Sequence, residues 1–334
     1  MRALFINPGG IGDQILFLPT GKLLKDKYPP CEIDLICEPR SSCIGQITNL
    51  YRKIREFDFK VSSPSIFELR NLIRRRKYRY LISSGLSYKA NLVAFLGHAD
   101  FKIGFYKGVF TNLLLTNPVK INTEQYVSNM FAELLTPVIP EVKDITRSKI
   151  LIPEIKINPE AIEWAKETLS PRIKERYYAK KIFIHPGVSS LSIKKNIIKT
   201  WGPKNWASLI EKLLENTNNT VILLGGKDDF EIISEIHKNL SFFARPKNFF
   251  DLSTLDITLD KLGALIGTSD LLVCVDSAPM HIAVALGKKL VAYFGPTDPK
   301  KLLPLDLRFT GICNATPEMM LNAINSQLTV SAPS

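Results

Sequence analysis

The sequence contains no long hydrophobic run. Although 45% of its 334 residues are apolar, no stretch approaches the roughly 18 consecutive apolar residues that a membrane-spanning helix needs. The first residues, MRALFINPGGIGD, form a short apolar segment followed by glycines, which is not the pattern of a secretory signal peptide. These absences predict a cytoplasmic protein and leave open a peripheral position at the inner face of the cytoplasmic membrane.

Cysteine and histidine are scarce and form no recognisable metal motif. The five cysteines contain no CxxC pair and the four histidines no HExxH motif, so we expect reduced thiols and no metal site. Cys31, Cys37 and Cys43 are evenly spaced, but they fall before a predicted strand, at its end and in the next predicted helix. That placement argues against a shared set of metal ligands.

Acidic residues are in short supply in the first half of the chain. The formal net charge is +12; residues 1–157 hold 23 Lys and Arg against 14 Asp and Glu, whereas residues 158–334 hold 21 against 18. A basic half suits an anionic acceptor or an anionic membrane surface, and no helix-turn-helix or aromatic-interleaved basic motif favours nucleic acid. The run RRRKYR at residues 74–79 is either the solvated end of a helix or part of such a surface.

Three glycines in four residues follow the first predicted strand. The segment PGGIGD at residues 8–13 lets the backbone approach a ligand closely. It lacks the Gly-Lys-Ser/Thr of a P-loop, and Ile15 stands where a dinucleotide fingerprint needs its last glycine, which excludes a nicotinamide dehydrogenase. Asp13 lies at the start of the next predicted helix, where it either caps that helix or serves as a general base at the carboxyl end of the strand.

Short apolar segments alternate with helical patterns along the whole chain. This alternation is typical of parallel, doubly wound sheets, and it restarts after a proline-rich segment at residues 137–159 that we interpret as a linker. The pattern predicts an α/β protein of two domains, residues 1–157 and residues 158–312, with a crevice between them. The tail, 313–334, is expected to form a helix that packs back on the first domain. The predicted strands are Arg2–Asn7, Glu32–Cys37, Lys53–Phe57, Tyr80–Ser83, Ile182–His185, Val221–Leu224, Phe249–Leu252, Leu271–Val275 and Leu290–Phe294.

The stretch from Leu271 to Pro299 reads as strand, tight turn, helix and strand. Asp276 and Ser277 are good N-caps, and Pro279 suits the first helical turn. A helix that begins at the carboxyl edge of a parallel sheet presents unpaired N–H groups and the positive end of its dipole, which together form an anion site. His281 can add a donor or a positive charge there; an ordinary capped turn with a surface histidine is the alternative.

Several motifs occur together and in order along the chain. They are the glycine-rich loop that ends in Asp13, His185-Pro186-Gly187, Lys199-Thr200-Trp201, Gly225-Gly226 and DSAPMHIAVALGKKLVAYFGPTDP. With this set, nearly the whole chain resembles glycosyltransferase family 9, the ADP-heptose:lipopolysaccharide heptosyltransferases and their relatives. The resemblance implies a GT-B fold, in which two Rossmann-like domains face a central cleft. It also implies inverting, metal-independent transfer of a heptose from ADP-heptose to a hydroxyl of a lipopolysaccharide inner-core acceptor.

The resemblance further implies roles for individual residues. Asp13 looks like the general base that deprotonates the acceptor hydroxyl, and positive groups in the second domain would neutralise the diphosphate leaving group without a metal or other cofactor. The implied donor-binding residues are Gly10, Gly12, Ser189, Ser190, Lys199, Asp229, Asp276, Ser277, Ala278 and His281. The loop before Lys199 is longer than the family pattern, so Lys194 or Lys195 is an alternative for the lysine.

Other functions remain open at this point. Ser83-Ser84-Gly85 lies on the acceptor side, where the family usually carries an acidic or Gln-containing strand end, so a protein hydroxyl or another glycan is an alternative acceptor. A nucleotide-sugar binding module without catalysis is a further alternative, because fold alone does not fix function. The presence of both Asp13 and His281 argues against that module.

Overall fold

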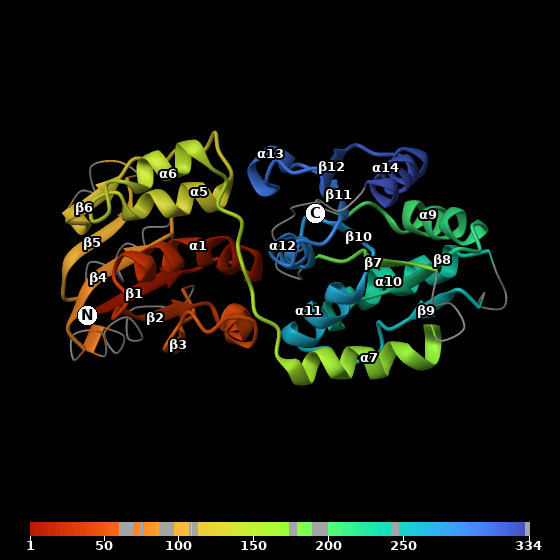
Figure 1. Ribbon diagram of the computed structural model, residues 1–334, viewed down its shortest axis with the longest axis horizontal. Helices are drawn as coiled ribbons and strands as arrows, with labels where there is room; N and C mark the ends of the chain where they lie inside the picture. The colour runs from red at the N-terminus through yellow and green to blue at the C-terminus, as the bar shows by residue number, and fades with distance from the viewer. Residues whose placement is uncertain are drawn as a thin grey trace. The chain divides into compact units, whose positions relative to one another are not determined.

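The computed structural model describes residues 1–59, 70, 71, 73, 76–86, 97–106, 108, 113–173, 179–188, 200–241 and 247–330. The chain forms two compact units, Met1–Lys156 and Ile157–Ser334. Each unit is built on one six-stranded sheet (Figure 1). The sheets have the same topological plan, in which the chain starts at a central strand, proceeds to one edge and then returns to build the other half.

The first unit has the strand order β3-β2-β1-β4-β5-β6, and every neighbouring pair is parallel. Its strands are β1 (Arg2–Asn7), β2 (Glu32–Cys37), β3 (Lys53–Glu56), β4 (Tyr78–Ser83), β5 (Ala99–Phe105) and β6 (Asn117–Val119). Its described helices are α1 (Ile11–Lys27), α5 (Val127–Ala132) and α6 (Val142–Ser148), with 3₁₀ turns η1 (Pro39–Gln46) and η2 (Glu133–Leu135). β1 and β2 are buried after their first residue, because central strands covered on both faces need near-continuous apolar runs.

Aromatic side chains fix α1 and α5 on one face of the first sheet. The ring of Phe5 in β1 lies 4.9 Å from that of Phe17 in α1, and the Phe17 ring lies 5.4 Å from that of Phe131 in α5. The opposite face buries a separate cluster that includes Leu4 and Ile6. The side chains of β1 thus pack on both faces of the sheet, and its central place in the strand order puts the loop that follows it near the middle of the sheet edge.

The second unit has the strand order β12-β11-β10-β7-β8-β9, again with parallel neighbours. Its strands are β7 (Lys180–His185), β8 (Asn219–Leu223), β9 (Phe249–Asp251), β10 (Leu271–Val275), β11 (Leu290–Phe294) and β12 (Phe309–Cys313). Its described helices are α7 (Pro159–Ile173), α9 (Pro203–Glu215), α10 (Phe230–Asn239), α11 (Leu259–Thr268), α12 (Ala278–Ala285), α13 (Pro299–Leu302) and α14 (Pro317–Thr329), with a 3₁₀ turn η4 (Lys227–Asp229).

Two sets of packed helices accompany the second sheet (Figure 1). α9 contacts α10 and α14, whereas α11 contacts α7 and α12. Helix α9 buries Trp206, Leu209, Ile210 and Leu213 in the core that it shares with the sheet. This spacing of three and four residues is that of an amphipathic helix with one apolar stripe.

The tail of the chain belongs to the second unit. Helix α14 contacts α9, β10 and β11, and the indole N–H of Trp201 donates to the carbonyl of Ala315 at 2.7 Å. The described part of the tail thus packs within the second unit, and the predicted contact of residues 313–334 with the first domain stays a prediction. Only a few residues connect β12 to α14, so the helix lies beside its own sheet, where Met320 is fully buried.

The predicted strands are confirmed to within a few residues, but three further strands were not predicted. β5, β6 and β12 lie at or near the outer ends of their sheets, and more than half of the residues in each are partly or fully exposed. Their sequences, ADFKIGF, NPV and FTGIC, therefore carry a weak apolar signal. The predicted helix that contains Cys43 is the 3₁₀ turn η1.

Candidate active site

The glycine-rich loop of the first unit lies where the strand order of its sheet reverses. β1 is flanked by β2 on one side and β4 on the other, and the chain leaves the carboxyl end of β1 to enter α1. In open α/β sheets, ligands bind outside the carboxyl ends of the strands at such a reversal. The loop therefore lies at the position in this unit that best suits a ligand.

Three buried side chains hold the backbone of this loop. The Asn7 amide accepts from the N–H of Gly9 at 3.0 Å and donates to the carbonyl of Asp13 at 3.1 Å. The Gln14 amide donates to the Asn7 carbonyl at 2.9 Å, and the Ser41 hydroxyl donates to the Gly9 carbonyl at 3.1 Å. The sequence pattern does not single out these three supporting residues, although a polar residue that ends an apolar strand, as Asn7 does, is a usable signal.

Asp13 lies exposed in the first turn of α1. Its Oδ2 accepts from the N–H of Gly10, the N-cap residue, at 2.9 Å, and its Oδ1 makes no hydrogen bond within the described ranges. The absence of a side chain at Gly9 is required, because a Cβ there would stand 2.4 Å from the Asp13 Cβ and 2.5 Å from Oδ2. An exposed carboxylate in a fixed position, with one uncommitted oxygen, is able to accept a proton.

Two further residues complete this loop. Gly12 is the second residue of α1 and is partly buried. Arg40, which the sequence pattern does not single out, extends from η1 so that its Nη1 would lie 3.5 Å from a Cβ on Gly10. The Arg40 side chain is exposed and adds a positive charge near Gly10.

Three loops of the second unit gather at one edge of its sheet. The segments that begin at Pro186, Leu224 and Asp276 follow β7, β8 and β10 directly, and these three strands are adjacent in the sheet. The strand order reverses between β7 and β10. By the same topological rule, this edge is the position in the second unit that best suits a ligand.

The start of α12 presents backbone N–H groups at this edge. Ser277 is the N-cap residue with extended backbone, Ala278 is the first helical residue, and Pro279 has no N–H to donate. No hydrogen bond from the N–H of Ser277 or Ala278 is found among the described residues. Both residues are partly exposed, whereas His281 in the same turn is only 5% exposed. Free N–H groups at a helix start are suited to bind an anion.

Asp276 connects two of the loops at this edge. It is 3% exposed, and its Oδ2 accepts from the hydroxyl of Thr297 at 2.7 Å. Its N–H donates to the carbonyl of Tyr293 at 3.1 Å. The turn before α12 is thereby attached to the loop after β11, and Thr297 is a supporting residue that the sequence pattern does not single out.

Asp229 joins the loops that follow β7 and β8. It is 6% exposed, its Oδ2 accepts from the N–H of Gly226 at 2.8 Å, and the Nε2 of His185 lies 3.6 Å from the same oxygen. A Cβ on Gly187 would lie 1.7 Å from the Asp229 Oδ1, so only glycine fits there. Burial lowers the pKa of His185 although the Asp229 charge opposes this effect, and the imidazole is therefore neutral near pH 7.

The remaining predicted site residues lie outside the described part of the chain. These are Ser189, Ser190 and Lys199, with Lys194 and Lys195 as the alternatives for the lysine. Among the residues that the structure does describe, no group of three or more His, Cys, Asp or Glu side chains is placed to hold a metal ion. All five cysteines are free thiols, and no helix within the described ranges is long and apolar enough to cross a membrane.

The sequence of residues 66–328 matches glycosyltransferase family 9, the heptosyltransferases. The chain belongs to this family. It is 26% identical to lipooligosaccharide heptosyltransferase 2 of Haemophilus influenzae, over an alignment that covers 98% of the chain and 99% of the relative. It is also 25% identical to lipopolysaccharide heptosyltransferase 3 of Escherichia coli, with coverage of 86% and 81%. Family membership confirms the predicted enzyme class, a heptosyl-transferring glycosyltransferase.

Solved structures of family 9 members have the same fold. The E. coli ADP-heptose lipopolysaccharide heptosyltransferase II aligns with a TM-score of 0.78 over 98% of each chain, at 20% identity. The E. coli heptosyltransferase WaaC with ADP aligns with a TM-score of 0.69 over 97% of this chain and 98% of that one, at 16% identity. The predicted GT-B fold class, with its two Rossmann-like domains, is confirmed.

Proposed function

We propose that this family 9 enzyme moves a heptose from ADP-heptose to a hydroxyl of a lipopolysaccharide inner-core acceptor, by an inverting and metal-independent reaction. Relatives named for heptose transfer in lipooligosaccharide and lipopolysaccharide support the donor and the acceptor class. The observation that carries the mechanism is the exposed Asp13 carboxylate, fixed by the Gly10 N–H at 2.9 Å.

Asp13 acts as the general base. A hydroxyl is a weak nucleophile at neutral pH, so its attack on the anomeric carbon is accelerated when a carboxylate removes the proton as the new bond forms. The acceptor oxygen bonds to the anomeric carbon from one face while ADP leaves from the other with the bonding electrons, and the configuration is inverted. The proton remains on Asp13 until solvent takes it.

The leaving diphosphate is stabilised by groups of the second unit. The N–H groups of Ser277 and Ala278 and the positive end of the α12 dipole bind its oxygens. His281 and Lys199 add donors, and the hydroxyls of Ser189 and Ser190 contact the phosphates. These groups supply the charge compensation that a metal ion supplies in other transferases.

The remaining assigned residues act on the donor in two ways. Gly10 and Gly12 let the backbone of the first unit approach the donor closely. Asp229 and Asp276 are buried, and each accepts a hydrogen bond from a residue of the site loops. We therefore assign them to positioning the donor-binding loops. Any contact with the ribose or the sugar uses a carboxylate oxygen that faces the donor.

The test compares Asp13→Asn with Asp26→Asn in heptose transfer from ADP-heptose to an inner-core lipid acceptor. Asp26 is an exposed aspartate near the end of the same helix and serves as the matched control. We expect kcat of the Asp13 variant to fall by about 10²–10⁴-fold, with little change in the KM for the donor, and the control to match the wild type. Equal turnover by both variants would contradict the role of Asp13.

The acceptor and the metal requirement are tested in the same assay. Transfer to a protein hydroxyl or to another glycan, but not to the lipid, would move the function to that acceptor class. Tight binding of ADP-heptose without transfer to any acceptor would instead favour a binding module. Addition of a chelator is expected to leave the rate unchanged, and a loss of activity that a divalent cation restores would contradict the metal-independent mechanism.

A further inference from the structure

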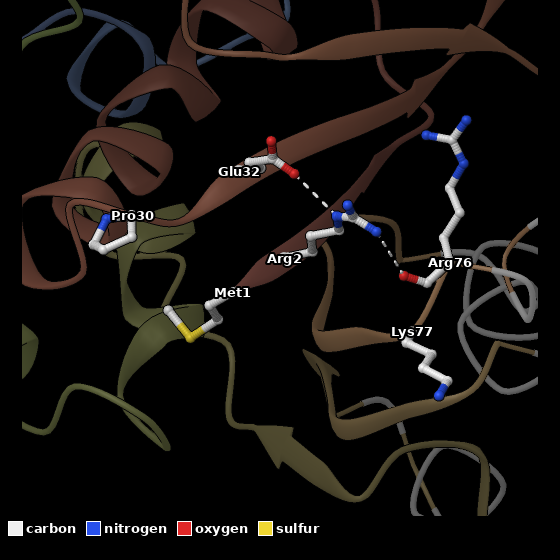
Figure 2. Close-up of a pocket in the computed structure, with 6 residues that line it drawn as sticks. All are labelled: Met1, Arg2, Pro30, Glu32, Arg76 and Lys77. Atoms are coloured by element: carbon white, nitrogen blue, oxygen red, sulfur yellow. Dashed lines mark hydrogen bonds and ion pairs between the residues drawn. The ribbon is translucent and has the colours of Figure 1, made fainter.

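A basic pocket lies at the amino-terminal edge of the first sheet. It has a volume of about 560 Å³ and is lined by residues at or just before the starts of β1, β2 and β4: Met1, Arg2, Pro30, Glu32, Arg76 and Lys77 (Figure 2). The glycine-rich loop and Asp13 follow the opposite, carboxyl end of β1, so this pocket is separate from the candidate active site of the unit. We propose that the pocket binds a phosphate group.

Arg2 is held in place at this pocket. Its Nε donates to Glu32 Oε2 at 2.9 Å and its Nη1 donates to the carbonyl of Arg76 at 3.4 Å (Figure 2). Its Nη2 makes no hydrogen bond within the described ranges. A planar guanidinium that is already oriented loses less conformational freedom when it binds a phosphate oxygen, and its geometry suits that ligand.

A buried carboxylate beneath the pocket fixes the chain that carries Arg76 and Lys77. Asp34 is 1% exposed, and its Oδ2 accepts from Arg52 at 2.6 Å, from the Tyr78 hydroxyl at 2.6 Å and from Arg76 at 3.3 Å. Arg52 and Arg76 compensate this buried charge and are not available as the main phosphate ligands. Arg52 and Arg76 hold the wall of the pocket in place, and their two positive charges exceed the single negative charge of Asp34.

Lys77 is the second proposed ligand. Its φ of 48° lies in the left-handed region, which disfavours residues with a Cβ and favours glycine. Its side chain is exposed, and no ion pair or hydrogen bond to its ammonium is present in the part of the chain that the structure describes. The lysine therefore occupies an unfavourable conformation without a compensating contact from the protein, and a bound phosphate supplies that contact.

The charges of the cluster favour an anion, although one carboxylate opposes it. Arg2, Arg52, Arg76 and Lys77 supply four positive charges, while Glu32 and Asp34 supply two negative ones. The hydrogen bond from Arg2, together with the charge of Arg52, lowers the pKa of Glu32 despite its partial desolvation. Glu32 is thus ionised at neutral pH and competes with the ligand for Arg2, so its removal should strengthen phosphate binding.

The basic run at residues 74–79 thereby acquires a specific role. Its residues Arg76 and Lys77 line a defined pocket and do not simply end a helix in solvent. A phosphate in this pocket can come from free inorganic phosphate or from the head group of an anionic phospholipid, since both present the same oxygens to Arg2 and Lys77. The two sources are separated by experiment.

The first experiment measures protection of Lys77 from acylation in the full-length protein by peptide mass spectrometry. Inorganic phosphate is one arm. The other compares vesicles of phosphatidylcholine alone with vesicles that contain equal parts of phosphatidylcholine and phosphatidylglycerol. Lys166, an exposed lysine of the second unit, is the control residue. Protection of Lys77 but not of Lys166 by inorganic phosphate supports the site and identifies free phosphate as the source. The same protection by the anionic vesicles, but not by the phosphatidylcholine vesicles, supports the site and identifies the lipid head group as the source.

The second experiment uses variants chosen to separate binding from folding. Lys77→Gly should weaken phosphate or vesicle binding about tenfold, while the unfolding midpoint stays the same or rises, because glycine suits the left-handed backbone. Asn314→Gly, at the other described non-glycine residue with positive φ, 51°, should leave binding unchanged, and Glu32→Gln should strengthen it. Equal protection of Lys77 and Lys166, no protection by either probe, or unchanged binding by Lys77→Gly would overturn the proposal.

Discussion

Replacement of Gly9 by alanine is predicted to disable Asp13 without altering its carboxyl group. The new Cβ would stand 2.4 Å from the Asp13 Cβ and 2.5 Å from its Oδ2. Rotation about χ1 cannot relieve the contact between the two Cβ atoms, because their positions are set by the backbone. The loop or the first turn of α1 must therefore shift, and the hydrogen bond from the Gly10 N–H to Asp13, at 2.9 Å, is strained or lost.

The size of the effect follows from these contacts. Loss of a hydrogen bond to a charged group costs about 1.5–3 kcal/mol, and the exposure of Asp13 favours the lower end of that range. Movement of the loop against the buried Asn7 adds strain, so we expect the free energy of unfolding to fall by about 2–3 kcal/mol. The rate should suffer as well, because a displacement of about 1 Å in a catalytic group can cost about a hundredfold in kcat.

The assay combines urea unfolding with heptose transfer at saturating ADP-heptose. Gly10→Ala is the stability control, because a Cβ there would meet only Arg40, at 3.5 Å, and a φ of −75° suits alanine. This control should unfold within about 0.5 kcal/mol of the wild type. A Gly9→Ala enzyme with wild-type kcat would refute the placement of Asp13 as the base, and equal destabilisation of both variants would refute the clash as the cause.

Two further predictions concern the second unit. Gly187→Ala brings a Cβ to 1.7 Å from Asp229 Oδ1 and should break the hydrogen bond between the Gly226 N–H and Asp229. We expect the KM for ADP-heptose to rise about tenfold or more, with a smaller effect on kcat. An unchanged KM would count against the role of Asp229 in positioning the loops. His185, whose pKa burial lowers, stays neutral in the fold while the unfolded chain gains a proton below about pH 6.5. Its contribution to stability is therefore complete above that pH and is lost as the pH falls through the folded-state pKa. His185→Gln should flatten the dependence of the urea midpoint on pH between about pH 7 and pH 5 relative to the wild type, and a variant with the wild-type slope would contradict this account.

The sequence predicts the central strands of both sheets well. β1, β10 and β11 carry near-continuous apolar runs, since both faces of a central strand are buried. β5 contains Asp100 and Lys102 because it lies near the outer end of its sheet and is partly exposed, and its pattern therefore resembles that of a loop. The proline-rich segment at residues 137–159, which we interpret as a linker, contains the helix α6, whose short sequence carries little apolar periodicity.

The loops of the candidate site could be located from the sequence, but their supporting residues could not. Parallel strands end at a common edge, so residues directly after strands are candidates by topology alone. The partners that fix these loops come from distant segments: Ser41 bonds to Gly9 and Thr297 bonds to Asp276. No local pattern in the sequence encodes which hydroxyl of the chain comes within hydrogen-bonding distance of which loop, since that depends on the packing of complete elements.

Exposure then separates three carboxylates that the sequence presents as equivalent. Asp13, Asp229 and Asp276 all follow strands. Asp13 and Asp229 also occupy the third position after a glycine N-cap residue, and the carboxylate of each accepts a hydrogen bond from the N–H of that glycine. Asp13 nevertheless remains exposed, whereas Asp229 is 6% and Asp276 3% exposed. A general base must reach a substrate proton with an oxygen that the protein has not engaged, and a buried carboxylate bonded to its own loops contributes by fixing those loops instead. The same capping geometry thus positions a proposed base in the first unit and anchors a loop in the second. The two carboxylates differ in exposure because neighbouring chain covers Asp229: Gly187 approaches it closely, and the imidazole of His185 lies beside it.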